Sequence, residues 1–302
     1  MTDPRLLIIV GKGGVGRTTV AAGLALEAGH RGLKVLVLEL NGLWDIGRRM
    51  RLARSYPAIA ISENVDWRSL TARECMEDFG KRKLKLGFVG SSVMGSRPLR
   101  AFVDAVPGLP DLLQLGKIEN LLNDPLPGDP VYDLVIVDAP ATGHGVTLLS
   151  APQSMTEISG AGPFHDLAST IADALAAPSS GVVVATLPEV LPLSETLGLL
   201  DQLEAMPIRT HRVVVNRVAP LPIPDLAQWP QIKSMLSDEP DLVRLADLTE
   251  GLLGVHAEEH EVLATLTRRA EQLRVPVSLV PTLPRRQTRV DLEAVATALG
   301  AR

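Results

Sequence analysis

The chain has 302 residues, of which 46% are hydrophobic, and this is enough to form a large core in one domain or two. A formal net charge of -5 provides no overall positive field, which argues against nucleic acid and anionic lipid as partners. Cys75 is the only cysteine, so the chain alone cannot form a disulfide, a CxxC redox pair or a site of several thiolates, and a reducing cytoplasm is the expected location.

Short apolar runs alternate with segments of helical periodicity along the chain. Because these runs of Val, Ile and Leu do not alternate with polar residues, they predict strands buried on both faces, as in a parallel sheet. The runs comprise residues 6–10, 34–40, 133–139, 181–187, 212–218 and 275–281. Segments between them, such as 19–32 and 194–206, have helical spacing.

This order of elements predicts one α/β domain over residues 1–302, doubly wound around a mostly parallel sheet of at least six strands. The ligand crevice of such a fold lies at the carboxyl ends of the strands. None of the apolar runs approaches the ~20 residues of a membrane span, so an integral membrane protein is not expected.

The second predicted strand ends near Leu40 and the third begins near Asp133, a gap far longer than the roughly 10 to 12 residues of a simple crossover. We predict that residues 45–130 form a helical insert that serves as a client or partner subdomain. Its apolar residues at helical spacing are Leu99, Phe102, Val103, Val106, Leu112, Leu113, Leu115, Ile118 and Leu122. This stripe either packs on the sheet, as most such stripes do, or forms a groove for a partner, and both interpretations stay open.

A glycine-rich loop joins the first predicted strand to the first predicted helix. Its sequence, GKGGVGRT, matches the phosphate-loop pattern GxxxxGK[ST] at Gly11, Gly16 and Thr18. Such a loop closes backbone N–H groups around phosphate oxygens, the helix N-terminus adds positive potential, and a hydroxyl binds Mg²⁺. We predict that the loop holds ATP or ADP with Mg²⁺, with Thr18 as a metal ligand. The predicted binding residues are Gly11, Gly13, Gly14, Val15, Gly16, Arg17, Thr18 and Thr19.

Arg17 occupies the position at which this loop normally has lysine. Lysine is a compact point charge, whereas a guanidinium is longer, bulkier and planar, so the exchange is not conservative. Phosphate binding depends mainly on the backbone and survives the exchange. Transition-state geometry is the more sensitive property. One such loss alone can be tolerated, but Arg17 together with Asn41, described below, predicts slow hydrolysis.

Lys12 places a second cation inside the loop. With this early lysine, GKGGVG is the deviant phosphate loop (Walker A) of the SIMIBI class of NTPases. Together with VDAPATGHGVTLL at 137–149, VVVNRV and VPTLP, it resembles the ArsA family, the arsenical pump-driving ATPases and their relatives that target tail-anchored membrane proteins. The motifs cover the sheet from end to end, and the chain is identified as a bacterial single-domain member.

The resemblance implies roles for several residues. Lys12 reaches across a dimer to the partner's nucleotide and neutralises charge that develops during phosphoryl transfer. Asp138 ends a strand and holds Mg²⁺ through water, and residues 141–144 continue as a switch loop that senses the γ-phosphate. Lys12, Arg17, Asn41 and Asp138 are thus the predicted catalytic residues.

The resemblance also implies an adenine site. Asn216 matches the asparagine that reads adenine in the family, since its amide can pair with both a donor and an acceptor on the purine edge. Pro281 and Leu283 belong to the loop that packs beside the base.

The residues that follow the second strand depart from the family pattern. Family members carry a DPA-type switch whose aspartate orients the attacking water, but this chain reads VLELNGLWDIG and has Asn41 at that position. An amide can position a water but cannot accept its proton. Glu39 or Asp45 substitutes only if the loop is shifted, and an ordinary Asn-Gly turn is an equally open interpretation.

Three functions remain to be distinguished. The first is an ATPase that couples hydrolysis and dimer closure to the handling of a membrane protein or another hydrophobic client. The second, suggested by Arg17 and Asn41, is a degenerate regulatory subunit that binds nucleotide and forms a heterodimer with a paralogous ATPase. The third is a positioning ATPase like MinD or ParA, which the short and nearly neutral tail VDLEAVATALGAR disfavours. Arsenite pumping is disfavoured because cysteine ligands for a metalloid are absent from the sequence.

Overall fold

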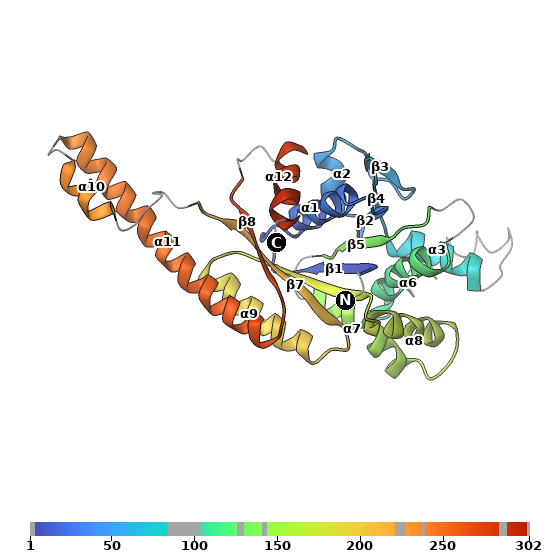
Figure 1. The fold of residues 1–302 in the computed structure, drawn as a ribbon. Coiled ribbons are helices and arrows are strands. Elements are labelled where there is room, and N and C mark those ends of the chain that lie inside the picture. Colours follow the sequence, from blue (N-terminus) through green and yellow to red (C-terminus); the bar gives the residue numbers. More distant parts are fainter. Residues whose placement is uncertain are drawn as a thin grey trace.

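The computed structural model describes residues 4–83, 103, 105–125, 130–140, 144–220, 228–236, 239–283 and 289–300. Within these residues the chain forms an eight-stranded sheet in the order β3-β4-β2-β5-β1-β6-β7-β8. Every neighbouring pair is parallel except β3 with β4. Helices cover both faces of this sheet (Figure 1), which confirms the predicted doubly wound α/β fold.

All six predicted strands are present. They are β1 (Leu6–Val10), β2 (Val35–Glu39), β5 (Leu134–Asp138), β6 (Ser180–Thr186), β7 (Arg209–Val218) and β8 (Val277–Pro281). The first four are buried along their whole length, because helices pack on both of their faces. Continuous apolar runs are the expected sequence for such strands.

One face of the sheet is covered by α1 (Arg17–His30), the short α2 (Asp45–Arg49) and α12 (Arg289–Gly300). A Cβ at Gly23 of α1 would lie 2.4 Å from a methyl group of Val295. Glycine at this position therefore allows α1 and α12 to pack in close contact.

The opposite face carries the longer helices. They are α3 (Ala72–Lys83), α6 (Leu109–Asn123), α7 (His144–Ile158), α8 (Pro163–Ala176), α9 (Val190–Glu204) and the C-terminal half of α11 (Pro240–Gln272). Arg269 of α11 pairs with Asp201 and Glu204, which joins α11 to α9. The N-terminal half of α11 extends away from the sheet beside α10 (Trp229–Met235; Figure 1). Leu245, Leu248 and Leu252 are exposed in this half of the helix.

The segment predicted as a helical insert, residues 45–130, includes two strands of the sheet. They are β3 (Ile59–Ser62) and β4 (Val65–Ser69), and β4 pairs with β2 in parallel register. The sequence of β4, VDWRS, does not indicate a buried strand, because two of its buried residues are charged. Asp66 is neutralised by Lys34 and bonded by the Tyr132 hydroxyl, and Arg68 lies over the Tyr56 ring. Part of this segment thus belongs to the sheet, and the division of the chain with a client subdomain stays a prediction.

The apolar stripe of α6 packs on the sheet. Leu112, Leu113, Leu115 and Ile118 are all at most 2% exposed, so these residues belong to the core. Leu115 and Ile118 also line a cavity of about 180 Å³ between α6 and α8. Leu99 and Phe102 of the predicted stripe lie outside the described residues. Among the helices that the structure describes, no helix has both the length and the apolar character needed to cross a membrane.

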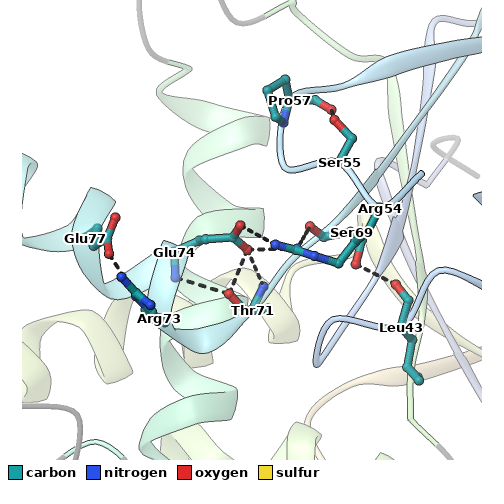
Figure 2. Close-up of polar contacts among 9 residues, drawn as sticks. All are labelled: Leu43, Arg54, Ser55, Pro57, Ser69, Thr71, Arg73, Glu74 and Glu77. Carbon is teal, nitrogen blue, oxygen red and sulfur yellow. Dashed lines mark hydrogen bonds and ion pairs between the residues drawn. The ribbon is translucent and has the colours of Figure 1, made fainter. Parts of the chain in front are cut away.

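Polar contacts at the end of β4 hold the loop that follows β2 (Figure 2). Thr71 and Glu74 form a capping box at the start of α3, with the Glu74 carboxylate accepting from the Thr71 N–H at 3.1 Å. Arg54 donates to both Glu74 oxygens, at 2.6 and 3.1 Å. The Ser69 hydroxyl donates to the Leu43 carbonyl at 2.5 Å. The bond from Ser69 thus attaches the segment that contains Asn41 to the end of β4, and the bonds of Glu74 attach Arg54 to the start of α3.

Candidate functional site

The glycine loop lies between β1 and α1, at the carboxyl edge of the sheet. Gly11, Gly14 and Gly16 have φ values of 148°, 87° and 92°, which side chains other than glycine rarely adopt. A Cβ at Gly11 would lie 2.2 Å from the Ala185 carbonyl oxygen, and one at Gly16 would lie 2.2 Å from the Asn216 amide nitrogen. The backbone therefore has the tight turn that a phosphate loop requires.

Thr18 and Asp138 meet beside this loop. The Thr18 hydroxyl donates to Asp138 Oδ2 at 2.6 Å, while Asp138 Oδ1 is buried with no hydrogen-bond partner among the described residues. Burial raises the pKa of Asp138 to about 6, and the bond from Thr18 opposes this effect. A hydroxyl oxygen and an unpaired carboxylate oxygen at a helix N-terminus are donors that suit Mg²⁺, directly or through water. The two residues therefore fit the predicted metal site.

Arg17 is folded back onto its own loop. Its Nη1 donates to the Gly11 carbonyl at 2.6 Å, and its Nε is buried with no partner among the described residues. Burial lowers the pKa of Arg17, and the charge of Asp138 opposes this change. The guanidinium thus lies near the predicted metal site, but the loop itself occupies one of its donors.

Arg49, the last residue of α2, is a cation that the sequence analysis missed. Its Nη1 is buried and has no hydrogen-bond partner within the described part of the chain. Burial lowers the pKa of Arg49, and Asp138 and then Glu39 are the opposite charges that counter this effect. The only signal in the sequence is the arginine pair at 48–49, which does not indicate which of the two faces the site.

Asn41 is held by a side chain of α6. Its backbone N–H donates to Gln114 Oε1 at 2.8 Å, and Gln114 Nε2 donates back to Asn41 Oδ1 at 2.8 Å. Gln114 is completely buried, and Asn41 has a φ of 55°, a left-handed conformation that asparagine tolerates well. In this structure Asn41 is therefore a turn residue whose side-chain oxygen, Oδ1, already accepts a hydrogen bond. A role in positioning water stays a prediction.

Glu39 and Asp45, the two alternatives to Asn41, are also engaged. Glu39 accepts from the N–H groups of Asp45 at 2.6 Å and Ile46 at 3.1 Å, and from the Trp67 indole at 2.6 Å. It therefore caps the N-terminus of α2. Asp45 forms an ion pair with Arg48. Glu39 is therefore committed to three donors, whereas Asp45 is held by an ion pair whose two side chains are both exposed.

Lys12 forms an ion pair with Glu195 of α9, within the same chain. Both side chains are about half exposed, so the pair can open readily. A cavity of about 490 Å³ adjoins this pair, and Gly11, Val146 and Leu199 are among the residues that line it. The lysine predicted to reach a partner's nucleotide is thus held by its own chain here.

The side chain of Asn216, on β7, holds the glycine loop in place. Its buried amide nitrogen donates to the Val15 carbonyl at 2.8 Å. Its role in adenine reading stays a prediction, as do those of Pro281, which is exposed at the end of β8, and Leu283, which packs against the α1 side of the core. Residues 141–143 and the side chain of His144, parts of the predicted switch loop, lie outside the described residues.

Comparisons with known proteins identify the family of the chain. A family model described as an anion-transporting ATPase matches residues 4–161, just over half of the chain. The chain is similar to ATPase BagA of Mycobacterium tuberculosis, with 29% identity over 305 residues that cover 94% of this chain and 88% of BagA. ATPase ASNA1 homolog 2 of Paramecium tetraurelia is 28% identical over 153 residues, 49% of this chain and 44% of that protein. These matches confirm the resemblance noted in the sequence, and the chain belongs to the ArsA family of anion-transporting ATPases.

Proposed function

We propose that the chain binds ATP with Mg²⁺ at Gly11–Thr19 and hydrolyses it slowly, with turnover coupled to closure of a dimer around the nucleotide. The observation that carries this proposal is the contact between Thr18 and Asp138 at the loop, which leaves one buried carboxylate oxygen for a ligand. The family to which the chain belongs supports the same reaction class.

Each part of the site has a task in this reaction. The backbone N–H groups of the loop and the N-terminus of α1 bind the phosphates. Mg²⁺, when bound through Thr18 and Asp138, neutralises phosphate charge. Arg17 keeps a positive charge at the loop, and Lys12 adds another across the dimer once it leaves Glu195. Asn41 positions water less effectively than a carboxylate because it cannot accept a proton.

The client is the finer part of the proposal. In the first candidate function, a homodimer in the cytoplasm uses closure to handle a membrane protein or another hydrophobic client. The second candidate is a regulatory subunit that pairs with a paralogous ATPase. It is supported by Arg17, which is bonded to Gly11, and by Asn41, which is bonded to Gln114. A positioning role like that of MinD or ParA has no comparable observation in its favour.

Asp138→Asn tests the metal and nucleotide site. We expect ADP or ATP with Mg²⁺ to raise the melting temperature of the unmodified chain, as ligand linkage requires. The substitution should remove the part of this rise that depends on Mg²⁺, because the amide is a poor metal ligand. Asp133→Asn, just before the other end of β5, is the matched control and should leave the nucleotide response unchanged. If millimolar nucleotide shifts neither the melting temperature nor calorimetric heats, the proposed function is wrong.

Substitutions of Lys12 and Glu195 test the closure of the dimer. Lys12→Ala should lower ATP turnover at least tenfold while changing nucleotide affinity less than threefold, because its target is the transition state across the interface. Glu195→Gln releases Lys12 and should shift the monomer–dimer equilibrium toward the dimer when a non-hydrolysable ATP analogue is present. Glu204→Gln removes a different ion pair of α9 and serves as the control. Sedimentation that finds a monomer under every condition contradicts the mechanism.

A further inference from the structure

Three buried polar atoms near the glycine loop have no hydrogen-bond partner among the described residues. They are Arg17 Nε, Arg49 Nη1 and Asp138 Oδ1, two donors and one acceptor. Leaving a buried polar group unpaired is costly, so such groups in a folded protein call for a ligand or an ordered water. The proposed function uses Arg17 and Asp138, but it gives no task to Arg49.

The direction of Arg49 is fixed by the way in which α2 is anchored. Glu39 binds the first N–H groups of the helix, and a Cβ at Gly47 would lie 2.4 Å from the Trp67 ring, so α2 rests directly on β4. Arg49 follows the fully buried Ile46 by three residues, and residues at this spacing share a helix face. Arg48, in contrast, is exposed and pairs with Asp45.

The charged groups that act on Arg49 stand at the carboxyl ends of the strands on either side of the loop. Asp138 and Glu39, whose residues pair in register at the ends of neighbouring strands, are its opposite charges. Arg217 acts on Arg49 as a like charge, and it directly follows Asn216, whose amide holds the loop. In the sheet, β1, which leads into the loop, lies between β5, which ends at Asp138, and β7, which carries Arg217.

We propose that Arg49 binds the terminal phosphates of the nucleotide and supplies, from α2, part of the charge that lysine provides at position 17 in other phosphate loops. This inference rests on the proposed function, since it deepens the description of the same site. A guanidinium presents planar paired donors that match phosphate oxygens, and Arg17 has already committed Nη1 to Gly11. Because α2 follows Asn41 closely, the contact also links the loop after β2 to the triphosphate.

Arg49→Ala tests this proposal by calorimetric titration with ATP and with ADP in the presence of Mg²⁺. We expect ATP affinity to fall about ten- to hundredfold, the loss of a charge-assisted pair, and ADP affinity to fall less. Arg49→Lys keeps the charge without the planar donors and should recover part of the loss. The matched control is Arg48→Ala, at the neighbouring exposed position of the same helix, and it should change ATP affinity less than twofold.

Unfolding by urea without nucleotide separates a ligand contact from a structural role. Because Arg49 Nη1 is buried without a hydrogen-bond partner among the described residues, removal of the side chain should leave the midpoint of the nucleotide-free protein unchanged or raised. A lower midpoint together with unchanged ATP affinity would make Arg49 a counterion of Glu39 and Asp138 and overturn the inference. If Arg49→Ala binds ATP as tightly as the unmodified chain, while Asp138→Asn still lacks the Mg²⁺-dependent response to nucleotide, the inference is wrong and the proposed function stands. Absence of ATP binding by the unmodified chain overturns both.

Discussion

Glu39→Ala is expected to lower the free energy of unfolding by about 3 kcal/mol in urea titrations without nucleotide. The Glu39 carboxylate is 1% exposed and accepts from two N–H groups at the start of α2 and from the Trp67 indole. Its removal leaves these donors without an acceptor and opens a space beneath the helix. Each buried donor without a partner costs about 1 to 3 kcal/mol, and partial access of water to the helix end reduces the sum.

Two further variants separate hydrogen bonding from charge and from general surface effects. Glu39→Gln keeps one acceptor oxygen and should cost roughly half as much as the alanine substitution. Glu63→Ala removes an exposed glutamate of the nearby β3–β4 turn and should change stability by less than about 0.5 kcal/mol. An alanine variant as stable as the unmodified chain would contradict the capping role of Glu39.

The same substitution should affect the site. Arg49 is carried by α2, and Glu39 holds the start of that helix. We therefore expect Glu39→Ala to weaken ATP binding in protein that is still folded, whereas Glu63→Ala should not. A capping residue at the end of a strand thus has a functional consequence through the element that it positions.

Backbone requirements made the glycine loop and the six apolar strands predictable. Only glycine fits at Gly11, where a Cβ would touch the Ala185 carbonyl, so the sequence of the loop follows from its shape. Strands such as β1 are buried on both faces and must be apolar throughout. β4 was missed because Asp66 and Arg68 are buried there, each with partners from distant segments that a local pattern does not show.

Long-range side-chain contacts limited the prediction of the site. Nothing near Asn41 in the sequence indicates that Gln114 holds it, and the ion pair of Lys12 with Glu195 likewise joins residues far apart in the chain. Such contacts depend on the packing of α6 and α9 against the sheet. The family resemblance identified the candidate site residues. It did not indicate which side chain each of them contacts in the nucleotide-free chain.

Arg17→Lys combined with Asn41→Asp is expected to raise ATP turnover more than the product of the two single effects. The unmodified chain should hydrolyse ATP well below the roughly 1 to 100 s⁻¹ typical of kinases. Lysine releases the bond to the Gly11 carbonyl and presents a compact charge to the phosphates. The substitution at Asn41 preserves the fold locally, because a carboxylate can still accept from Gln114 Nε2 and retains a second oxygen for the attacking water.

The two changes act on one transition state, which is why their effects should not be independent. Charge at the phosphates stabilises the transferred group, and a carboxylate orients the water that attacks it, so each change gains effect when the other is in place. Steady-state ATPase rates at saturating Mg²⁺ and ATP measure this directly. Arg5→Lys with Asn123→Asp makes the same chemical changes in a contacting pair at the opposite edge of the sheet, and it should leave turnover unchanged.

Brisk hydrolysis by the unmodified chain, unaffected by the double substitution, would contradict this prediction. It would mean that Arg17 is a competent replacement for lysine and that another group orients the water. Asp45 is then the first residue to examine, because its ion pair with the exposed Arg48 can open, whereas Glu39 is committed to three donors. Turnover that stays slow in the double variant and rises only when a paralogous ATPase is added would instead favour the regulatory subunit.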